Sequence, residues 1–354
     1  MLDQNISAEL QAAVANASRE GRPLRIVGGG SKDFLGRQPT GATLLCAGHS
    51  GLVNYDPTEL VVTVRAGTGL HALQAALSDH GQMLPFEPPA FGDQATVGGT
   101  VACGLSGPRR PFTGAVRDFV LGTRVLTGRG EILRFGGDVM KNVAGYDLSR
   151  LMCGAFGTLG VLLEVSLKVL PRPRVERTRH FEMSASEAIE AMNRWAGAPL
   201  PITGACHASG VLHLRLSGAE TAVAAAETYL GGEPLVDAED WWADLREHRL
   251  AFFAGDDPLW RLSVRSSAPP LELPGSWMVD WGGAQRWLRS EASAENVRQA
   301  AAAAGGHATL YRGGDRQGDV FTPLPCALAA LHRAVKQALD PVAILNPGRL
   351  YADF

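Results

Sequence analysis

Two glycine-dense segments, about seventy residues apart, constrain the fold of this chain more than any other feature of its sequence. The first, GGGSK at 28–32, directly follows an apolar stretch at 23–27 that is typical of a short buried strand. The second, ATVGGTVACG at 95–104, contains Thr96, a residue type that caps the start of a helix. Clustered glycine indicates backbone that comes close to a neighbouring group, because no side chain intervenes.

The first segment has the composition of a phosphate-binding loop. Bare backbone after a strand lets successive N–H groups point at an anion, and Lys32 adds a positive charge. The segment departs from two common templates, however. A GxGxxG fingerprint starting at Gly28 would need glycine where Asp33 stands, and the GK[ST] of a Walker loop is absent. An ordinary tight turn is therefore the alternative at this segment.

The presence of a second glycine segment favours a dinucleotide ligand. One anion rarely needs two separate glycine loops, whereas a dinucleotide cofactor does, because its pyrophosphate could sit on one loop and another part, such as a ribityl chain and isoalloxazine ring, against the other. The alternative for the second segment is close packing of a short helix on a sheet.

Length and composition exclude several classes of protein. The 354 residues are enough for about two domains, and 45% hydrophobic and 19% charged residues are ordinary for a folded chain. The net charge of −3 lacks the positive surplus of a dedicated nucleic-acid binder. The sequence contains no apolar run long enough to span a bilayer, and its start, MLDQNISAEL, does not resemble a signal peptide. We therefore expect no nucleic acid, no membrane span and a cytoplasmic location.

Cysteine and histidine usage argues against metal cofactors. The five cysteines are scattered and never form a CxxC pair, which disfavours both a disulfide framework and an iron–sulfur cluster. The nine histidines form no HxH or HExxH spacing, so we expect no bound metal. Any electrons that this chain handles would then be carried by an organic cofactor.

A change in glycine content and in the order of predicted elements divides the chain after residue 173. Strands and glycine-rich turns precede it, and the elements expected after it follow the β-α-β-β-α-β order of a ferredoxin-like unit. A last predicted helix, at 324–339, leads into the turn at 346–348. We predict a first domain over 1–173, a second domain over 174–320, and a C-terminal helix and tail over 321–354.

Five stretches carry a family resemblance. They are VGGGSKDFLG (27–36), NYDPTELVVTVRAGT (54–68), ATVGGTVACGLSGPRRP (95–111), VMKNVAGYDLSRLMCGAFGTLGVL (139–162) and LNPGRLYADF (345–354). Together they closely resemble the FAD-binding subunits of bacterial glycolate oxidase, within the vanillyl-alcohol oxidase and p-cresol methylhydroxylase (PCMH) type of flavoproteins. The resemblance runs from about residue 20 to the C-terminus and is densest in the first half.

The resemblance implies an α+β fold, with a two-lobed PCMH-type FAD-binding domain, a ferredoxin-like α+β cap domain and a tail that returns to the flavin. It implies non-covalent FAD, since no histidine lies in or just after the first glycine segment. The backbone of 28–32 would hold the pyrophosphate, and the other residues would surround the ribityl chain and flavin. The implied cofactor-binding residues are Gly28, Gly29, Gly30, Ser31, Lys32, Pro88, Thr96, Gly98, Gly99, Ala102, Gly104, Thr158, Gly160, Val161, Asn346 and Gly348.

The resemblance also implies an activity: oxidation of glycolate, a small 2-hydroxy acid, to glyoxylate, with hydride transfer to FAD and electrons passed to partner subunits and quinone. The implied partners are a larger flavin subunit and an iron–sulfur subunit, which would bring the chain to the inner face of the cytoplasmic membrane. The larger subunits carry a GEHGIG-like element with paired metal histidines, whereas this chain has only GGHAT around His307. A non-catalytic role in assembly or electron relay is therefore the alternative.

The substrate site is less constrained by the sequence. A small carboxylate calls for an arginine clamp, for which Arg261, Arg265, Arg286 and Arg289 are candidates, with surface ion pairing as the alternative. His307 is the one histidine considered for the site, against a structural role at the start of a strand. Three arginines beside the second glycine segment could neutralise a pyrophosphate, dock an acidic partner or form a solvated face; they are Arg109, Arg110 and Arg117.

Overall fold

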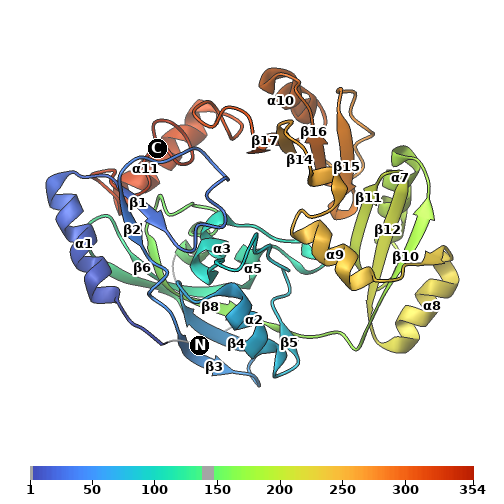
Figure 1. Ribbon diagram of the computed structural model, residues 1–354, viewed down its shortest axis with the longest axis horizontal. Helices are drawn as coiled ribbons and strands as arrows, with labels where there is room; N and C mark the ends of the chain where they lie inside the picture. The colour runs from blue at the N-terminus through green and yellow to red at the C-terminus, as the bar shows by residue number, and fades with distance from the viewer. Residues whose placement is uncertain (1–2, 138–146) are drawn as a thin grey trace. The chain divides into compact units, whose positions relative to one another are not determined.

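The computed structural model describes residues 3–137 and 147–354, coloured along the chain in Figure 1. It divides into two compact units. Unit 1 comprises Met1–Ser106, Ala115–Pro171 and Arg316–Phe354, and unit 2 comprises Gly107–Gly114 and Arg172–Asp315. Compared with the boundaries expected from the sequence, the C-terminal helix and tail belong to unit 1, and the short segment Gly107–Gly114 belongs to unit 2. Part of the fourth family stretch, at 139–146, lies outside the described residues.

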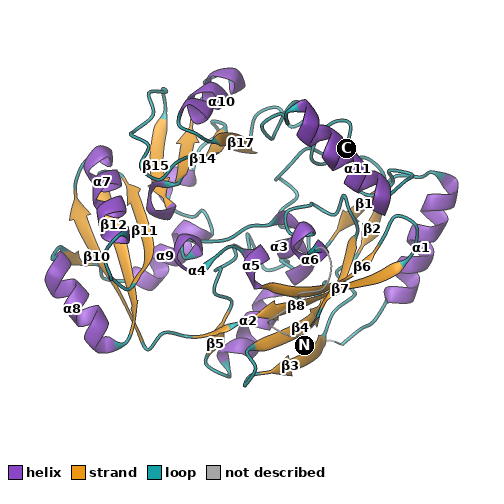
Figure 2. Cartoon of the chain, turned by 180° about the vertical axis from the view of Figure 1, so that it is seen from behind, coloured by secondary structure: helices purple, strands orange, loops and turns teal. Residues whose placement is uncertain are grey.

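The main sheet of unit 1 is antiparallel and has the strand order β3-β4-β8-β6-β7 (Figure 2). Its strands are β3 (Leu52–Asp56), β4 (Val61–Arg65), β6 (Val120–Leu126), β7 (Ile132–Gly136) and β8 (Val161–Lys168). The central strand, β8, is buried along almost its whole length. Its Val165 and Leu167 belong to the cluster that contains α2 (Leu70–Ser78) and α3 (Val97–Cys103), whereas Leu163 packs with α1 (Ser7–Glu20). Burial on both faces explains its nearly continuous apolar sequence.

Smaller elements of unit 1 surround this sheet. They are β1 (Leu24–Val27), which pairs in parallel with β2 (Ala42–Leu45), β5 (Gln82–Met83), which pairs with β9 (Leu170–Pro171), α5 (Val116–Phe119), α6 (Leu148–Leu151) and α11 (Cys326–Leu339). Strand β1 ends where the first glycine segment begins, as its apolar sequence predicts. Leu345 of the tail forms a parallel bridge with Leu24, so the C-terminus returns beside β1.

Unit 2 contains an eight-stranded sheet with the order β13-β10-β12-β11-β15-β16-β14-β17. Its first part consists of β10 (Val175–Glu182), α7 (Ala185–Ala196), β11 (Ile202–Ala208), β12 (Val211–Gly218), α8 (Glu220–Leu230) and β13 (Glu233–Pro234). This order of elements, with β10 and β12 adjacent at the centre, is the ferredoxin-like arrangement that the sequence predicts. A capping box of Ser184 and Glu187 starts α7, and its Ile189, Met192 and Trp195 face the core.

The rest of unit 2 extends the same sheet. It consists of α4 (Arg110–Thr113), α9 (Ala238–Arg246), β14 (Leu259–Ser263), β15 (Ser276–Asp280), β16 (Gln285–Arg289), α10 (Ala294–Ala303) and β17 (His307–Arg312), with short 3₁₀ turns at Ala251–Phe253 and Trp281–Gly283. Strand β16 was not expected, because its sequence QRWLR places two arginines among five residues, yet all five are buried.

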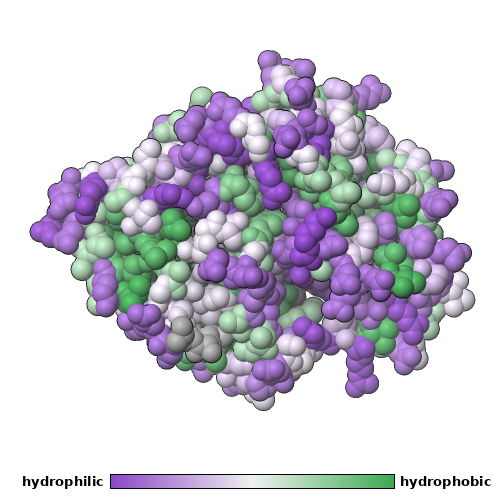
Figure 3. All heavy atoms as spheres, in the orientation of Figure 1, coloured by the Kyte–Doolittle hydropathy of each residue, from purple (hydrophilic) through white to green (hydrophobic). Residues whose placement is uncertain are grey.

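Figure 3 shows one face of the molecule, where hydrophilic residues predominate and apolar residues form separate patches. In the part of the chain that the structure describes, no helix has both the length and the apolar character needed to cross a membrane.

Candidate cofactor site

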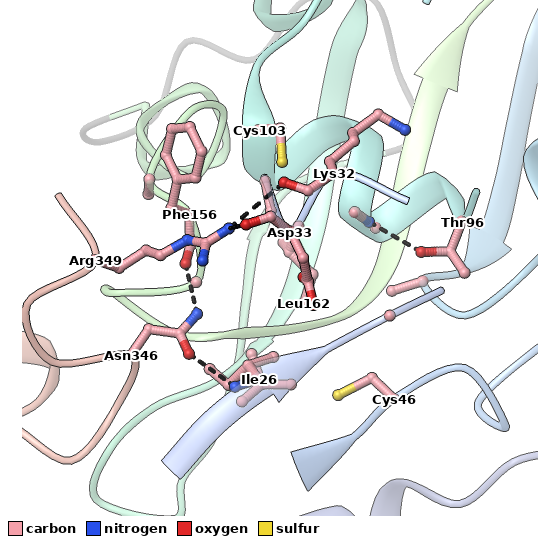
Figure 4. Close-up of a pocket in the computed structure, with 18 of the residues that line it drawn as sticks. Ile26, Lys32, Asp33, Cys46, Thr96, Cys103, Phe156, Leu162, Asn346 and Arg349 are labelled. Atoms are coloured by element: carbon pink, nitrogen blue, oxygen red, sulfur yellow. Dashed lines mark hydrogen bonds between the residues drawn. The ribbon is translucent and has the colours of Figure 1, made fainter. Parts of the chain in front are cut away.

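A pocket in unit 1 brings together four segments that lie far apart in the sequence. They are the end of β1 with the first glycine segment, the second glycine segment, the loop 155–160 with the start of β8, and the C-terminal tail (Figure 4). Most of the predicted cofactor-binding residues line it: Gly28, Gly29, Gly30, Ser31, Lys32, Thr96, Gly98, Gly99, Ala102, Gly160, Val161 and Asn346.

The first glycine segment contacts the second directly. A Cβ atom built on Gly29 would lie 1.4 Å from the carbonyl oxygen of Gln94, and one on Gly28 would lie 2.5 Å from Oγ1 of Thr96. Gly30 has a φ of +75°, which favours glycine. Glycine is therefore required here both by the turn and by the close approach of the two segments.

The backbone of the first segment is available to a ligand. Within the described residues, the N–H groups of Gly28, Gly29, Gly30 and Ser31 donate to no acceptor, although all four residues line the pocket. Consecutive unpaired backbone N–H groups form an anion-binding concavity. The pocket thus contains the donors that a pyrophosphate requires.

The second glycine segment presents a different surface. Thr96 caps α3 by accepting a hydrogen bond from the Gly99 N–H, at 3.2 Å, and the Gly98 N–H donates to the Ala66 carbonyl at 2.7 Å. A Cβ on Gly98 would lie 2.6 Å from Cβ of Ala66, so this glycine also allows close packing of the helix. Because these N–H groups already have acceptors, α3 offers the pocket a smooth wall suited to an uncharged part of a ligand.

The C-terminal tail reaches the pocket through Asn346. Its Oδ1 accepts a hydrogen bond from the Ile26 N–H, and its Nδ2 donates to the Phe156 carbonyl, each at 2.7 Å (Figure 4). Asn346 is buried and has a φ of +43°, a region that asparagine tolerates better than most residues. The tail therefore links the strand before the glycine segment to the loop on the opposite wall.

Positive charge at the pocket comes from Lys32, which the sequence predicts, and from two arginines that it does not predict. Lys32 is buried, and its ammonium donates to the Ala90 carbonyl at 3.1 Å. Arg25 and Arg349 also line the pocket; Arg25 pairs with Asp33, and burial lowers the pKa of Arg349. The one available signal was the position of Arg349 within the tail stretch, directly after the predicted Gly348.

Four predicted cofactor residues do not line the pocket, and their contacts lie elsewhere in unit 1. Pro88 is buried beside the loop that holds Lys32. Gly104 ends α3 with a φ of +67°, against Gly154. Thr158 is fully buried and donates to the Ala155 carbonyl, and the Gly348 N–H donates to the carbonyl of the last residue.

Two of the candidate arginines for a substrate clamp are engaged inside unit 2. Arg286 is 1% exposed and donates to the carbonyls of Gly283 and Ala268, each at 2.7 Å. Arg289 donates to the carbonyls of Phe253 and Asp257, each at 3.0 Å. Both guanidinium groups hold loop backbone, so neither is placed to receive a carboxylate.

The buried arginine of β16 leads to a stability prediction. We expect Arg286→Met to lower the free energy of unfolding by about 2–4 kcal/mol, because two buried carbonyls lose a charged donor. Thermal unfolding of the apoprotein measures this effect, and FAD affinity should be unchanged. A direct role in substrate binding would instead require a raised KM with unaltered stability.

Arg261 and His307 lie on neighbouring strands of the same sheet. Register pairs Arg261 with Thr309 and Ser263 with His307, so all four side chains project from one face. The Arg261 guanidinium lies 5.6 Å from the centre of the Tyr311 ring, and His307 is exposed. Desolvation and the charge of Arg261 lower the pKa of His307. Arg265 lies two residues after β14, is exposed, and donates to the Ala304 carbonyl at 3.4 Å.

The arginines that follow the second glycine segment do not line the pocket, contrary to the interpretation that they neutralise a pyrophosphate. Arg109 is buried in unit 2, where its Nη2 lies 2.5 Å from Oε2 of Glu176. Arg110 lies over the Trp281 ring, 4.4 Å from its centre. These contacts hold the segment Gly107–Gly114 in unit 2, whereas Arg117 is exposed on α5.

Among the residues that the structure describes, no group of three or more His, Cys, Asp or Glu side chains could hold a metal ion.

Comparisons with known proteins agree with this architecture. A family model described as "FAD binding domain" matches residues 6–136. The glycolate oxidase subunit GlcE of Escherichia coli (strain K12) is 53% identical over 347 residues, which cover 98% of each chain. The glycolate oxidase subunit GlcD of Bacillus subtilis (strain 168) is 32% identical over 172 residues, 48% of this chain and 36% of that protein.

A solved structure of p-cresol methylhydroxylase with substrate bound shares the fold. It superimposes with a TM-score of 0.72 at 16% identity, covering 99% of this chain and 88% of that one. The α+β, PCMH-type fold that the sequence predicts is thereby confirmed. With a relative 53% identical along nearly its whole length, the chain belongs to the FAD-binding family of the glycolate oxidase subunit GlcE.

Proposed function

We propose that the unit 1 pocket binds FAD non-covalently and that the chain acts in a complex that oxidises glycolate to glyoxylate. The observation that carries the first part is the run of unpaired N–H groups at Gly28–Ser31 within a pocket also walled by α3. These donors would hold the pyrophosphate, with Arg25 and Arg349 contributing positive charge. The wall formed by Gly98, Gly99 and Ala102 would receive the ribityl chain and ring.

Oxidation of glycolate removes a hydride from C2 and a proton from the hydroxyl group. FAD, when bound, supplies the two-electron acceptor for the hydride. Arg261 would bind the substrate carboxylate, as a charged fork suited to that group. His307, neutral because its pKa is lowered, would take the hydroxyl proton. Both side chains project from one face of the unit 2 sheet, which supports their acting together.

Partner subunits complete the proposal. Relatives named as glycolate oxidase subunits GlcE and GlcD support a multi-subunit enzyme. We infer that electrons leave through a larger flavin subunit and an iron–sulfur subunit to quinone. The second candidate function is that of a flavin-bearing assembly or relay subunit. The sequence GGHAT around His307 favours it, because this element lacks paired histidines.

An anaerobic glycolate titration separates these two functions. In the reconstituted complex, flavin bands assigned to this chain should bleach on addition of glycolate. Selective labelling is possible by reconstituting the apo form of this chain with an FAD analogue of shifted absorption. Bleaching of the partner's flavin alone would exclude substrate oxidation by this chain and leave the relay or assembly role.

Arg261 and His307 give this proposal a pH-dependent test. Arg261→Met should raise the KM for glycolate about 100-fold, since a charge-assisted pair is lost. It should also move the acid limb of kcat/KM to higher pH, because removing the positive charge raises the pKa of His307. Arg249→Met, at an exposed arginine paired with Asp244, is the matched control. An unchanged KM and pH profile in Arg261→Met would remove both residues from the substrate site.

A further inference from the structure

A buried lysine in α11 connects three parts of unit 1. Every residue of α11 is described, and Lys336 is the one that is buried, with 5% of its surface exposed. Its ammonium donates to the Thr158 carbonyl at 2.7 Å, the Leu345 carbonyl at 2.8 Å and Oδ2 of Asp340 at 2.8 Å. All three protons of the ammonium are therefore used.

The partner carboxylate organises the turn that follows the helix. Asp340 is completely buried; its Oδ1 accepts from the Ile344 N–H at 3.1 Å and its Oδ2 from the Leu345 N–H at 2.8 Å. A Cβ on Gly128 would lie 2.2 Å from Oδ1 of Asp340, so the carboxylate is tightly enclosed. The pair thus fixes the backbone directly before Asn346.

Both walls of the pocket depend on this arrangement. Leu345 precedes Asn346 in the tail, and Thr158 lies two residues after Phe156 in the opposite loop. Lys336 therefore holds both chain segments that the hydrogen bond between Asn346 and Phe156 joins. Neither Lys336 nor Asp340 lines the pocket itself.

Stability alone is a poor explanation for such a pair. Burying a lysine and an aspartate costs desolvation, and replacing a buried ion pair by apolar residues is often neutral or stabilising. What an apolar pair would lose here is the set of directed bonds to Thr158 and to the tail. The geometry thus points to a role in positioning the tail and the loop that contains Thr158.

We propose that Lys336 and Asp340 are positioning residues for the cofactor, which hold Asn346 and the loop 155–160 in the arrangement that FAD requires. The inference rests on the proposal that this pocket binds FAD. It adds a buried ion pair, outside the pocket, that sets the spacing between the C-terminal tail and the loop 155–160.

The test compares two variants of α11, each of which loses one positively charged side chain. Lys336→Met keeps the length of the side chain and removes its three donors, and we expect the Kd for FAD to rise between tenfold and a hundredfold in the folded protein. The visible circular dichroism of the bound flavin should also change. Arg333→Met, which breaks an exposed ion pair with Asp353, should leave both unchanged. If Lys336→Met does not fold, Asp340→Asn replaces it, with the same expectation.

A double-mutant cycle distinguishes positioning from general stabilisation. If Lys336 acts through Asn346, the double variant Lys336→Met/Asn346→Ala should show a smaller fold-increase in the Kd for FAD than the product of the fold-increases of the two single variants. An effect equal to that product, or a wild-type Kd and flavin spectrum in Lys336→Met, would overturn the inference. Failure of the unsubstituted protein to bind FAD would instead overturn the proposed function.

Discussion

Replacement of Gly29 by alanine is expected to weaken FAD binding at least about 100-fold. The added Cβ would lie 1.4 Å from the Gln94 carbonyl oxygen and 2.4 Å from its carbon, both backbone atoms. No rotamer relieves the contact, because a Cβ is fixed to the backbone. The variant can fold only if the segments 28–32 and 94–96 separate, which moves the N–H groups away from the wall formed by α3.

The measurement is the FAD content of the purified variant and the Kd of its apo form. We expect the Kd to rise at least about 100-fold, equivalent to about 2.8 kcal/mol at 1.4 kcal/mol per tenfold. Gly69→Ala is the matched control: Gly69 has a φ of −58°, and its added Cβ would meet nothing closer than 3.8 Å. Full FAD content in Gly29→Ala, or equal loss in the control, would show that the pyrophosphate binds elsewhere.

Replacement of Asn346 by alanine should weaken both the cofactor site and the fold. The change leaves the Ile26 N–H and the Phe156 carbonyl without their side-chain partner, at a cost of about 2–4 kcal/mol in unfolding free energy. Alanine also tolerates the φ of +43° less well than asparagine. Because the tail then no longer joins the two walls, we expect the Kd for FAD to rise about 30-fold or more.

Asn346→Asp provides a graded comparison. The aspartate keeps an acceptor for the Ile26 N–H but sets a negative oxygen against the Phe156 carbonyl. Its thermal stability and FAD affinity should therefore both fall below those of the unsubstituted protein. A variant Asn346→Ala that keeps wild-type affinity despite reduced stability would show that the tail supports the fold without shaping the pocket.

Local sequence patterns predicted the parts of the fold whose causes are local. The strand before GGGSK, the cap at Thr96 and the β-α-β-β-α-β order each depend on neighbouring residues, and the structure contains all three. The glycines of the first segment also have a local cause, since Gly28 and Gly29 lie where Gln94 and Thr96 leave no room for a side chain.

Features that depend on distant partners could not be predicted in this way. Arg286 and Arg289 looked like surface or substrate-binding charges, because the carbonyls that satisfy them lie in separate loops. Arg109 looked like a cofactor residue because it follows the second glycine segment, but its partner, Glu176, is 67 residues further along the chain. Lys336 gave no signal, since an exposed lysine suits an amphipathic helix equally well.

Comparing the affinities of the apoprotein for FAD, FMN and riboflavin tests whether the N–H groups of Gly28–Ser31 bind a pyrophosphate. FAD has this group, and the two shorter flavins lack it. We predict that FAD binds at least about 1000-fold more tightly than riboflavin, with FMN far closer to riboflavin than to FAD. Equal affinity for FAD and riboflavin, or no binding of FAD, would show that these N–H groups hold no pyrophosphate.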